Sequence, residues 1–199
     1  FEKQTSTHGM PLSAAGASFE KTVKNLGGDP DEPFKVFPEV ADYYKEINNK
    51  KREIIKKKKE IQAKWEKENP ELSRKLNSYL DGSIPEFDFS EVEQKEGIAT
   101  RAASGAVLAK FASKIENMIV ASADLSNSDK TDGFLKNSKA LVKGDFSGAF
   151  LQMGVSELTM AAVANGIALH GGIIPVCGTF FVFSDYMKPS IRLASLMET

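Results

Sequence analysis

Apolar positions in the first half of the chain recur at the spacing of one long amphipathic helix. Between residues 39 and about 68, gaps of four and three residues alternate along a single stripe. The stripe consists of Val40, Tyr44, Ile47, Lys51, Ile54, Lys58, Ile61 and Trp65. This period is that of an α-helix, and the two lysines can extend over apolar neighbours. Pro38 can open the helix in its first turn, and Asn69-Pro70 ends it.

Shorter segments flank this helix. Residues 13–26 predict a short helix that Gly27-Gly28 stops, followed by a turn-rich connector over 29–33. Residues 70–80 predict another helix that Asp81-Gly82 ends, and residues 83–96 predict a linker. The first region is therefore expected to be a helical arm.

The second region alternates between apolar runs and helical patterns. Strands are predicted at 118–121, 150–155 and 173–176, helices at about 100–114, 157–169 and 186–197, and a polar loop at 122–131. Such βα alternation is typical of a parallel sheet. The fold class is therefore α/β: a partial domain with a parallel sheet over 97–199, preceded by a helical connector arm over 1–96, with the boundary near Gly97.

Composition narrows the function classes only slightly. The chain carries 26 basic and 27 acidic side chains. Its formal charge of -1 therefore gives no net electrostatic attraction to nucleic acid. A single cysteine, Cys177, allows neither an internal disulfide nor a thiolate metal cluster, which fits a reducing cytoplasm. The nearly apolar run over 171–183 is too short to span a bilayer. We expect no nucleic acid and no membrane as partners.

The N-terminal sequence has neither an initiator Met nor a secretory leader. This suggests a chain cut from something longer.

One carboxyl group stands out as a candidate for chemistry. Glu157 follows an apolar strand and begins a helix that is apolar nearly all round. Open α/β sheets bind ligands at strand ends, and an apolar environment suits a carboxyl that holds or releases a proton. Acidic residues are also common at helix starts for electrostatic reasons alone. Both interpretations stay open at this point.

A wider pattern is more specific. Five separated motifs occur in order: Ala99-Thr100-Arg101-Ala102-Ala103-Ser104, Ser122-Ala123-Asp124-Leu125, Gly154-Val155-Ser156-Glu157, Asn165 to Gly172, and Gly178 to Tyr186. In order and spacing they resemble the pyrimidine-binding domain of transketolase. Upstream, Thr7-His8-Gly9-Met10-Pro11-Leu12 resembles the segment that leaves the family's diphosphate-binding domain. The motif departs from the family at Ser156 and Leu158, where an arginine and an aromatic residue or histidine are usual.

The resemblance implies a role for each matching residue. Glu157 is the acid that hydrogen-bonds the pyrimidine ring of thiamine diphosphate and thereby activates the cofactor. Phe180, Phe183 and Tyr186 surround that ring, where flat side chains suit a flat heterocycle. Arg101 and Ser128 bind the sugar phosphate: the guanidinium of Arg101 can donate two hydrogen bonds to it, and the hydroxyl of Ser128 can donate one.

Two further residues are implied by the same resemblance. His8 lies near the cofactor diphosphate and the substrate, where an imidazole can donate a hydrogen bond or move a proton. Asp124 lies near the cofactor at the subunit contact, although a loop-capping aspartate is the competing interpretation. His170 and Cys177 lack companions at ligand spacing and are expected to be structural.

The resemblance also implies the activity of an intact parent. A transketolase moves a two-carbon ketol unit from a ketose phosphate to an aldose phosphate and works as a homodimer. Its diphosphate is held through Mg²⁺ or Ca²⁺ by a Gly-Asp-Gly motif, which this sequence lacks. We therefore expect no metal ligands within the chain and no activity of the chain by itself.

Two alternatives remain from different classes. The first is a related thiamine-diphosphate enzyme, either deoxyxylulose-phosphate synthase or the β-subunit of a 2-oxo-acid dehydrogenase. The second is a non-catalytic binding module that uses the lysines at 50–51 and 56–59 to engage RNA or an acidic partner.

Overall fold

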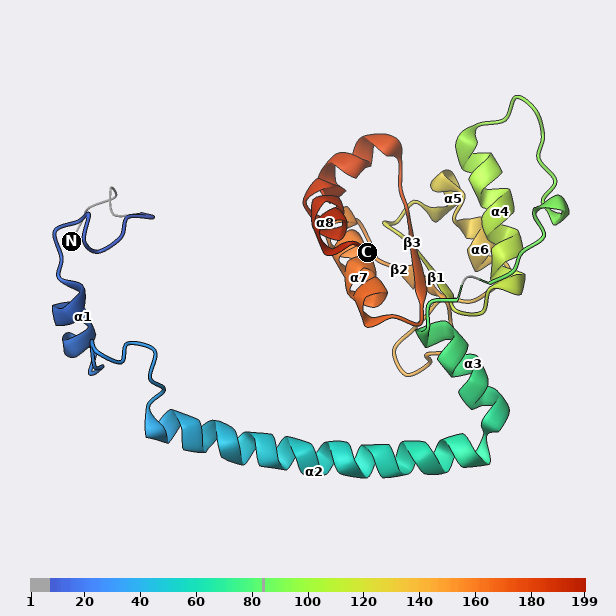
Figure 1. Cartoon of the computed structure of the whole chain (residues 1–199). Helices are drawn as coiled ribbons and strands as arrows, with labels where there is room; N and C mark the ends of the chain where they lie inside the picture. Colours follow the sequence, from blue (N-terminus) through green and yellow to red (C-terminus); the bar gives the residue numbers. More distant parts are fainter. Residues whose placement is uncertain (1–7, 84) are drawn as a thin grey trace. The chain divides into compact units, whose positions relative to one another are not determined.

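The computed structural model describes residues 8–83 and 85–199, which fall into two compact units divided between Lys67 and Glu68. We call them unit 1 and unit 2 and describe each by itself. Unit 1 contains two helices, α1 (Phe19–Asn25) and most of α2 (Pro38–Glu68). Figure 1 shows both in blue to cyan.

Helix α1 begins later than the predicted residue 13. Gly16 has a φ of +75°, which an α-helix does not contain, so residues 12–16 form turns instead. The Ser18 side chain then caps the helix by accepting a hydrogen bond from the Lys21 N–H at 3.2 Å. The prediction for 13–18 was wrong because the local pattern did not reveal the left-handed glycine.

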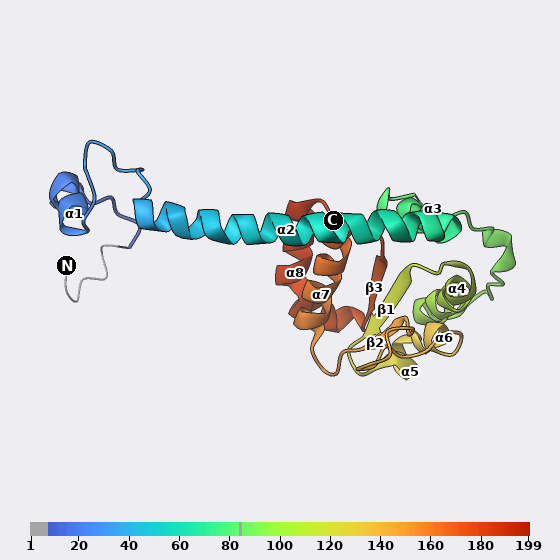
Figure 2. The same ribbon diagram turned by 90° about the horizontal axis from the view of Figure 1, so that it is seen from below.

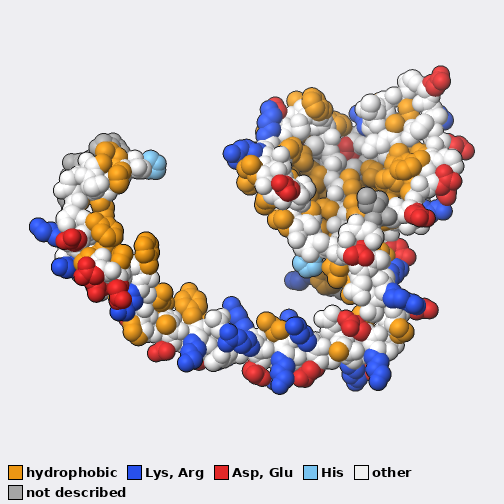
Figure 3. Space-filling view, in the orientation of Figure 1, with side chains coloured by type: hydrophobic (Ala, Val, Ile, Leu, Met, Phe, Trp, Pro, Cys, Tyr) orange, Lys and Arg blue, Asp and Glu red, His pale blue; other side chains and the backbone are white. Residues whose placement is uncertain are grey.

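Helix α2 confirms the long amphipathic segment, including its start at Pro38. None of its residues is buried, and charged side chains lie along its length (Figure 3). Pairs such as Lys50 and Glu46, 2.6 Å apart at i,i+4, support the helix locally. The helix therefore forms without burying its apolar stripe within unit 1.

Unit 2 contains the parallel sheet that the βα alternation predicts, and its three strands lie in the order β2-β1-β3. Val120 pairs with Phe150 of β2 on one side and with Val176 of β3 on the other. Figures 1 and 2 agree that α7 and α8 cover one face of the sheet and that α4, α5 and α6 cover the other. Parallel strands need such crossover helices.

The elements of unit 2 are α3 (Pro70–Leu80), η2 (Phe89–Glu91), α4 (Thr100–Lys114), β1 (Met118–Ser122), α5 (Ser126–Asp129), α6 (Asp132–Leu135), β2 (Phe150–Gln152), α7 (Glu157–His170), β3 (Ile174–Gly178), η3 (Phe181–Phe183) and α8 (Ser184–Met197). The predicted bounds of α3 and α4 are confirmed. Two predictions need correction: the loop at 122–131 contains α5, and β2 ends at Gln152 instead of Val155. The described part of the predicted linker at 83–96 is irregular apart from η2, and it docks through Phe87, whose ring meets that of Phe111 at 4.8 Å.

The central strand divides its side chains between two cores. Met118 and Val120 pack with Phe134 and Phe150 on the α4 side, whereas Ala121 packs toward α7 and α8. Successive strand residues point to opposite faces, so a strand that is covered on both faces is apolar throughout. The small side chain at 121 leaves room for Met160 of α7 and Met187 of α8, which lie in the same core cluster.

No helix among the described residues is both long and apolar enough to cross a membrane.

Candidate active site

The predicted site residues of unit 2 follow the carboxyl ends of the three strands. Asp124 and Ser128 come after β1, Glu157 after β2, and Phe180 after β3. Because the strands are parallel, these ends share one edge of the sheet, where open α/β sheets bind ligands. Arg101 lies in the first turn of α4, on the neighbouring face.

Glu157 is the first residue of α7, and it is 7% exposed. Within the described residues, no hydrogen bond or ion pair reaches its carboxyl group. Ser156 fixes the preceding turn by donating to the Met153 carbonyl at 2.7 Å, and α8 ties the same end of α7 through Ser190, which donates to the Leu158 carbonyl at 3.3 Å. The start of α7 is thus held in place, and the Glu157 carboxyl is left with its hydrogen-bonding capacity unused among the described residues, although its oxygens are not fully buried.

Three aromatic rings form a row beyond β3. The Phe180 and Phe183 rings lie 5.8 Å apart with an angle of 19° between their planes, and Phe183 and Tyr186 lie 6.3 Å apart at 29°. The i,i+3 spacing through η3 explains the near-parallel rings, since side chains three residues apart eclipse in a 3₁₀ turn. Phe183 is half-buried and Tyr186 exposed. The row offers a flat apolar surface.

Arg101 approaches this row from α4. Its Cζ lies 5.8 Å from the centre of the Phe180 ring, within the range of a cation–π contact. Arg101 and Phe180 line a pocket of about 400 Å³ together with Asp129, Thr131 and Thr179. No carboxylate in the described part of the chain forms an ion pair with Arg101.

Sequence reasoning missed the polar network beneath this pocket. The buried Asp129 carboxylate accepts hydrogen bonds from the Ser122 hydroxyl at 2.8 Å, the Thr131 N–H at 2.8 Å and the Thr131 hydroxyl at 2.7 Å. The Thr179 hydroxyl is buried without a partner among the described residues. An aspartate two residues before a threonine in a polar stretch was the available signal, because Asx turns have that spacing.

Gly178 is required by the same network. A Cβ at this position would lie 2.1 Å from the Thr131 side chain and 3.3 Å from the Asp129 carboxylate. Only glycine lets the end of β3 pass this close to the loop after β1.

Asp124 and Ser128 lie in the loop after β1. Asp124 is exposed with a φ of +68°, a conformation that aspartate tolerates better than most residues. It lines a polar pocket of about 360 Å³ with Ser122, Gln152 and Gly154. The Ser128 hydroxyl donates to the Asn127 side chain at 3.3 Å, and no bond in the described residues joins it to Arg101.

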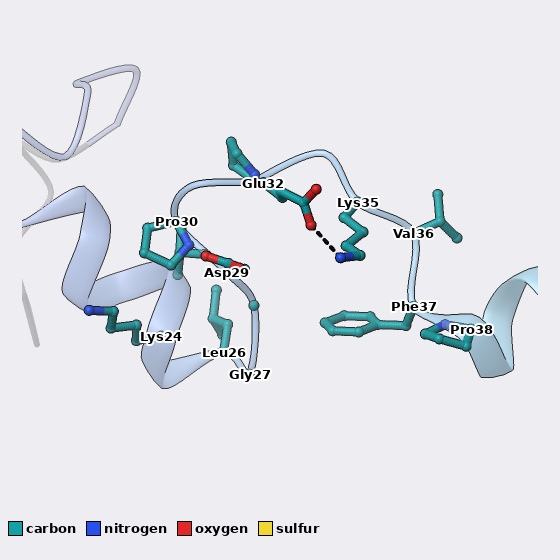
Figure 4. A pocket seen from close by; sticks show the side chains of 13 residues that line it. Lys24, Leu26, Gly27, Asp29, Pro30, Glu32, Lys35, Val36, Phe37 and Pro38 are labelled. Atoms are coloured by element: carbon teal, nitrogen blue, oxygen red, sulfur yellow. Dashed lines mark hydrogen bonds and ion pairs between the residues drawn. The ribbon is translucent and has the colours of Figure 1, made fainter.

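His8 belongs to unit 1, where it lies in an exposed turn. Unit 1 also contains a pocket of about 630 Å³, lined by the loop between α1 and α2 (Figure 4). Its walls include Leu26, Phe37 and the ion pair of Glu32 with Lys35. This pocket combines an apolar wall with a neutralised charge pair and has no buried acid or base, so the candidate chemistry lies in unit 2.

The fold and the site together define a class: a parallel α/β domain with a buried carboxyl and an aromatic row at the carboxyl edge of the sheet. Residues 96–199 match the family model of the transketolase pyrimidine-binding domain, and residues 1–85 match that of the transketolase thiamine diphosphate binding domain. The chain belongs to the transketolase family.

Individual relatives agree with the family models. A transketolase of Halalkalibacterium halodurans is 36% identical over 195 residues, which are 96% of this chain and 29% of the relative. Among solved structures, a transketolase from Leishmania mexicana has a TM-score of 0.74 at 29% identity, covering 86% of this chain and 26% of that one. A transketolase variant from Pichia stipitis, solved in complex with xylulose 5-phosphate, has a TM-score of 0.73 at 31% identity, covering 89% and 27%. The chain thus spans less than a third of these relatives.

Proposed function

We propose that this chain supplies the pyrimidine-binding part of the active site of a transketolase. The enzyme transfers a two-carbon ketol unit from a ketose phosphate such as xylulose 5-phosphate to an aldose phosphate such as ribose 5-phosphate. The observation that carries the proposal is Glu157, a buried carboxyl without a partner in the described residues, at the carboxyl edge of the sheet. Because the chain spans 29% of the Halalkalibacterium relative, the activity is assigned to a longer polypeptide that contains it.

The site residues suit the pyrimidine part of thiamine diphosphate. A buried carboxyl with unused hydrogen-bonding capacity suits a ring nitrogen, and near-parallel aromatic rings suit the faces of a heterocycle. When bound, thiamine diphosphate supplies the carbon nucleophile that this chemistry requires. Phe180, Phe183 and Tyr186 would hold the ring.

Each residue of the chain has a separate task in this proposal. Glu157 hydrogen-bonds the pyrimidine nitrogen from its place at the start of α7 and moves a proton there. Arg101 and Ser128 bind the substrate phosphate by charge-assisted hydrogen bonds. His8 acts near the diphosphate and the substrate, and Asp124 acts near the cofactor.

The remaining expectations belong to the same proposal. The Mg²⁺ or Ca²⁺ ligands lie outside the chain, and the described residues contain no group of three potential ligands that could hold a metal ion. A homodimer is supported by apolar residues exposed on α7 and just before it, Val155, Leu158 and Leu169. We also propose action in the pentose phosphate pathway of the cytoplasm and a domain boundary near Gly97.

The test is ketol transfer by the full-length protein that carries this sequence, assayed with thiamine diphosphate and Mg²⁺. Glu157→Gln keeps the size of the side chain but removes its titratable proton, and we expect a loss of at least about a hundredfold in kcat. Glu93→Gln makes the same change on an exposed linker residue and should keep full activity. An inactive wild type, or a Glu157→Gln enzyme as active as wild type, contradicts the proposal.

A further inference from the structure

We propose that Phe180 is a positioning residue for the substrate phosphate, because its ring holds the guanidinium of Arg101 ready to bind. Phe180 would then serve two groups: the cofactor ring through the aromatic row and the phosphate through Arg101. The inference rests on the proposed function, in which Arg101 binds the substrate phosphate.

The geometry connects the two tasks in one side chain. The Phe180 ring lies 5.8 Å from the Arg101 Cζ and 5.8 Å from the centre of the Phe183 ring. Phe180 is half-buried, and both it and Arg101 line the pocket of about 400 Å³ beside β3. A ring supported by a neighbouring ring is a fixed platform, whereas an exposed arginine by itself samples many rotamers.

Electrostatics explains why a ring suits this position better than a carboxylate. A carboxylate would occupy the guanidinium N–H donors, which a phosphate also needs. An aromatic face attracts the cation through the ring quadrupole and leaves those donors available. In the described residues Arg101 has no ion-pair partner, in agreement with this requirement.

The one carboxylate that lines the same pocket is already engaged. Asp129 accepts three hydrogen bonds, one from Ser122 and two from Thr131. Its oxygens are thus directed to the end of β1 and to Thr131. Asp129 forms no ion pair with Arg101 among the described residues.

Loss of the ring should therefore weaken productive binding of phosphorylated substrates specifically. A cation–π contact at an exposed site corresponds to about a two- to fivefold change in an equilibrium constant. We expect Phe180→Leu to lower the ratio of kcat/KM for a phosphorylated ketose to kcat/KM for a ketose without phosphate by that factor. Using a ratio cancels any loss of cofactor binding, which affects both substrates alike.

The first experiment measures the contact directly, without any catalytic assay. In the full-length protein labelled with ¹⁵N-arginine, the Arg101 Nε–Hε signal is assigned by its disappearance in Arg101→Lys. We expect a ring-current shift of this signal that Phe180→Leu abolishes and Phe180→Tyr preserves. An Arg101 signal unchanged in Phe180→Leu overturns the proposal, whatever the activity of the enzyme.

The second experiment uses the full-length protein and the kcat/KM ratio. Phe180→Tyr should keep the ratio, and Phe146→Leu should also keep it, since it removes an exposed ring that does not line the pocket of Arg101. In an Arg101→Gln background, Phe180→Leu should no longer change the ratio, because the two residues act as a pair. An equal drop in both backgrounds overturns the proposal, whereas an inactive wild type contradicts only the proposed function and leaves the spectroscopic result to decide the contact.

Discussion

Unit 1 and unit 2 are stabilised in different ways. In unit 2 the central strand is covered on both faces, so that Val120 and Phe150 are at most 1% exposed. In unit 1 the long helix α2 has no buried residue and depends on local terms such as helix propensity and i,i+4 pairs. The amphipathic pattern therefore predicted α2 correctly, but it did not show that the apolar stripe of this helix stays unburied within unit 1.

The largest expected effect is a core deletion in unit 2. Phe150→Ala removes a ring that is 1% exposed and should lower the free energy of unfolding by about 3–5 kcal/mol. The matched change in unit 1, Phe34→Ala, removes a ring that is 96% exposed and should stay within about 0.5 kcal/mol. Urea unfolding is followed by hydrogen exchange of the β1 amides for Phe150→Ala and by far-ultraviolet circular dichroism, to which the helices of unit 1 contribute, for Phe34→Ala. Equal effects would contradict the difference between the units.

A smaller effect is expected where backbone segments approach closely. Gly178→Ala places a methyl 2.1 Å from the Thr131 side chain and should cost about 1–3 kcal/mol through the shifts it forces. Gly166→Ala in α7 meets no atom within 4 Å and should instead stabilise by about 0.5–1 kcal/mol, since alanine favours a helix. Thermal unfolding of the two variants checks these opposite signs. A destabilised Gly166→Ala variant would contradict the open space around position 166 of α7.

A local effect is expected in α2. Ala63→Gly in this exposed helix should cost about 1 kcal/mol of helix propensity and reduce the far-ultraviolet circular dichroism, while amide exchange in β1 stays unchanged. The same substitution at the buried Ala161 of α7 should accelerate exchange in β1, because Ala161 belongs to the core that includes Ala121. Faster β1 exchange in Ala63→Gly would show that the units do not unfold separately.

The smallest effect concerns a surface carboxylate of unit 2. Hydrogen bonds from Lys139 and Ser147 hold the pKa of Asp145 well below its usual range. A depressed carboxyl pKa stabilises the fold above the unfolded pKa of about 3.9, and this stabilisation is lost as the pH falls through the folded value. The difference in Tm between wild type and Asp145→Asn should therefore be largest near neutral pH and shrink as the pH drops below 4. A difference that does not change with pH would exclude this linkage.

The sequence predicted the elements whose signals are local. Helices α3 and α4 were placed with correct bounds; for α3 the signals are Pro70 at its start and Asp81-Gly82 at its end. Short helices such as α5 were missed, since the buried Asp129 within it is satisfied by Ser122 and Thr131 and no periodic pattern reports such contacts. Strand β2 was drawn too long because Gly154, with a φ of +65°, turns the chain away from its partner.

In the candidate site, too, local signals could be read from the sequence, whereas contacts between distant segments could not. Glu157 could be singled out as a candidate from sequence because it lies between an apolar strand and an apolar helix, but only the family pattern favoured a functional role over an ordinary helix start. The contact of Arg101 with Phe180 could not be selected, because 79 positions separate two residues that only the packing of α4 beside β3 brings together.

By itself the sequence determined the helical periods, the strand order along the chain and the family motifs, because caps, turns and apolar spacing act over a few residues. The tertiary structure alone decided which apolar faces are buried, which carboxylates find partners and which residues share a pocket. The physical reason is that burial and hydrogen bonding depend on segments far apart in sequence. Asp129 and Glu157 illustrate this: both are buried acids, yet the loop after β1 satisfies the first, and the described residues leave the second available for a ligand.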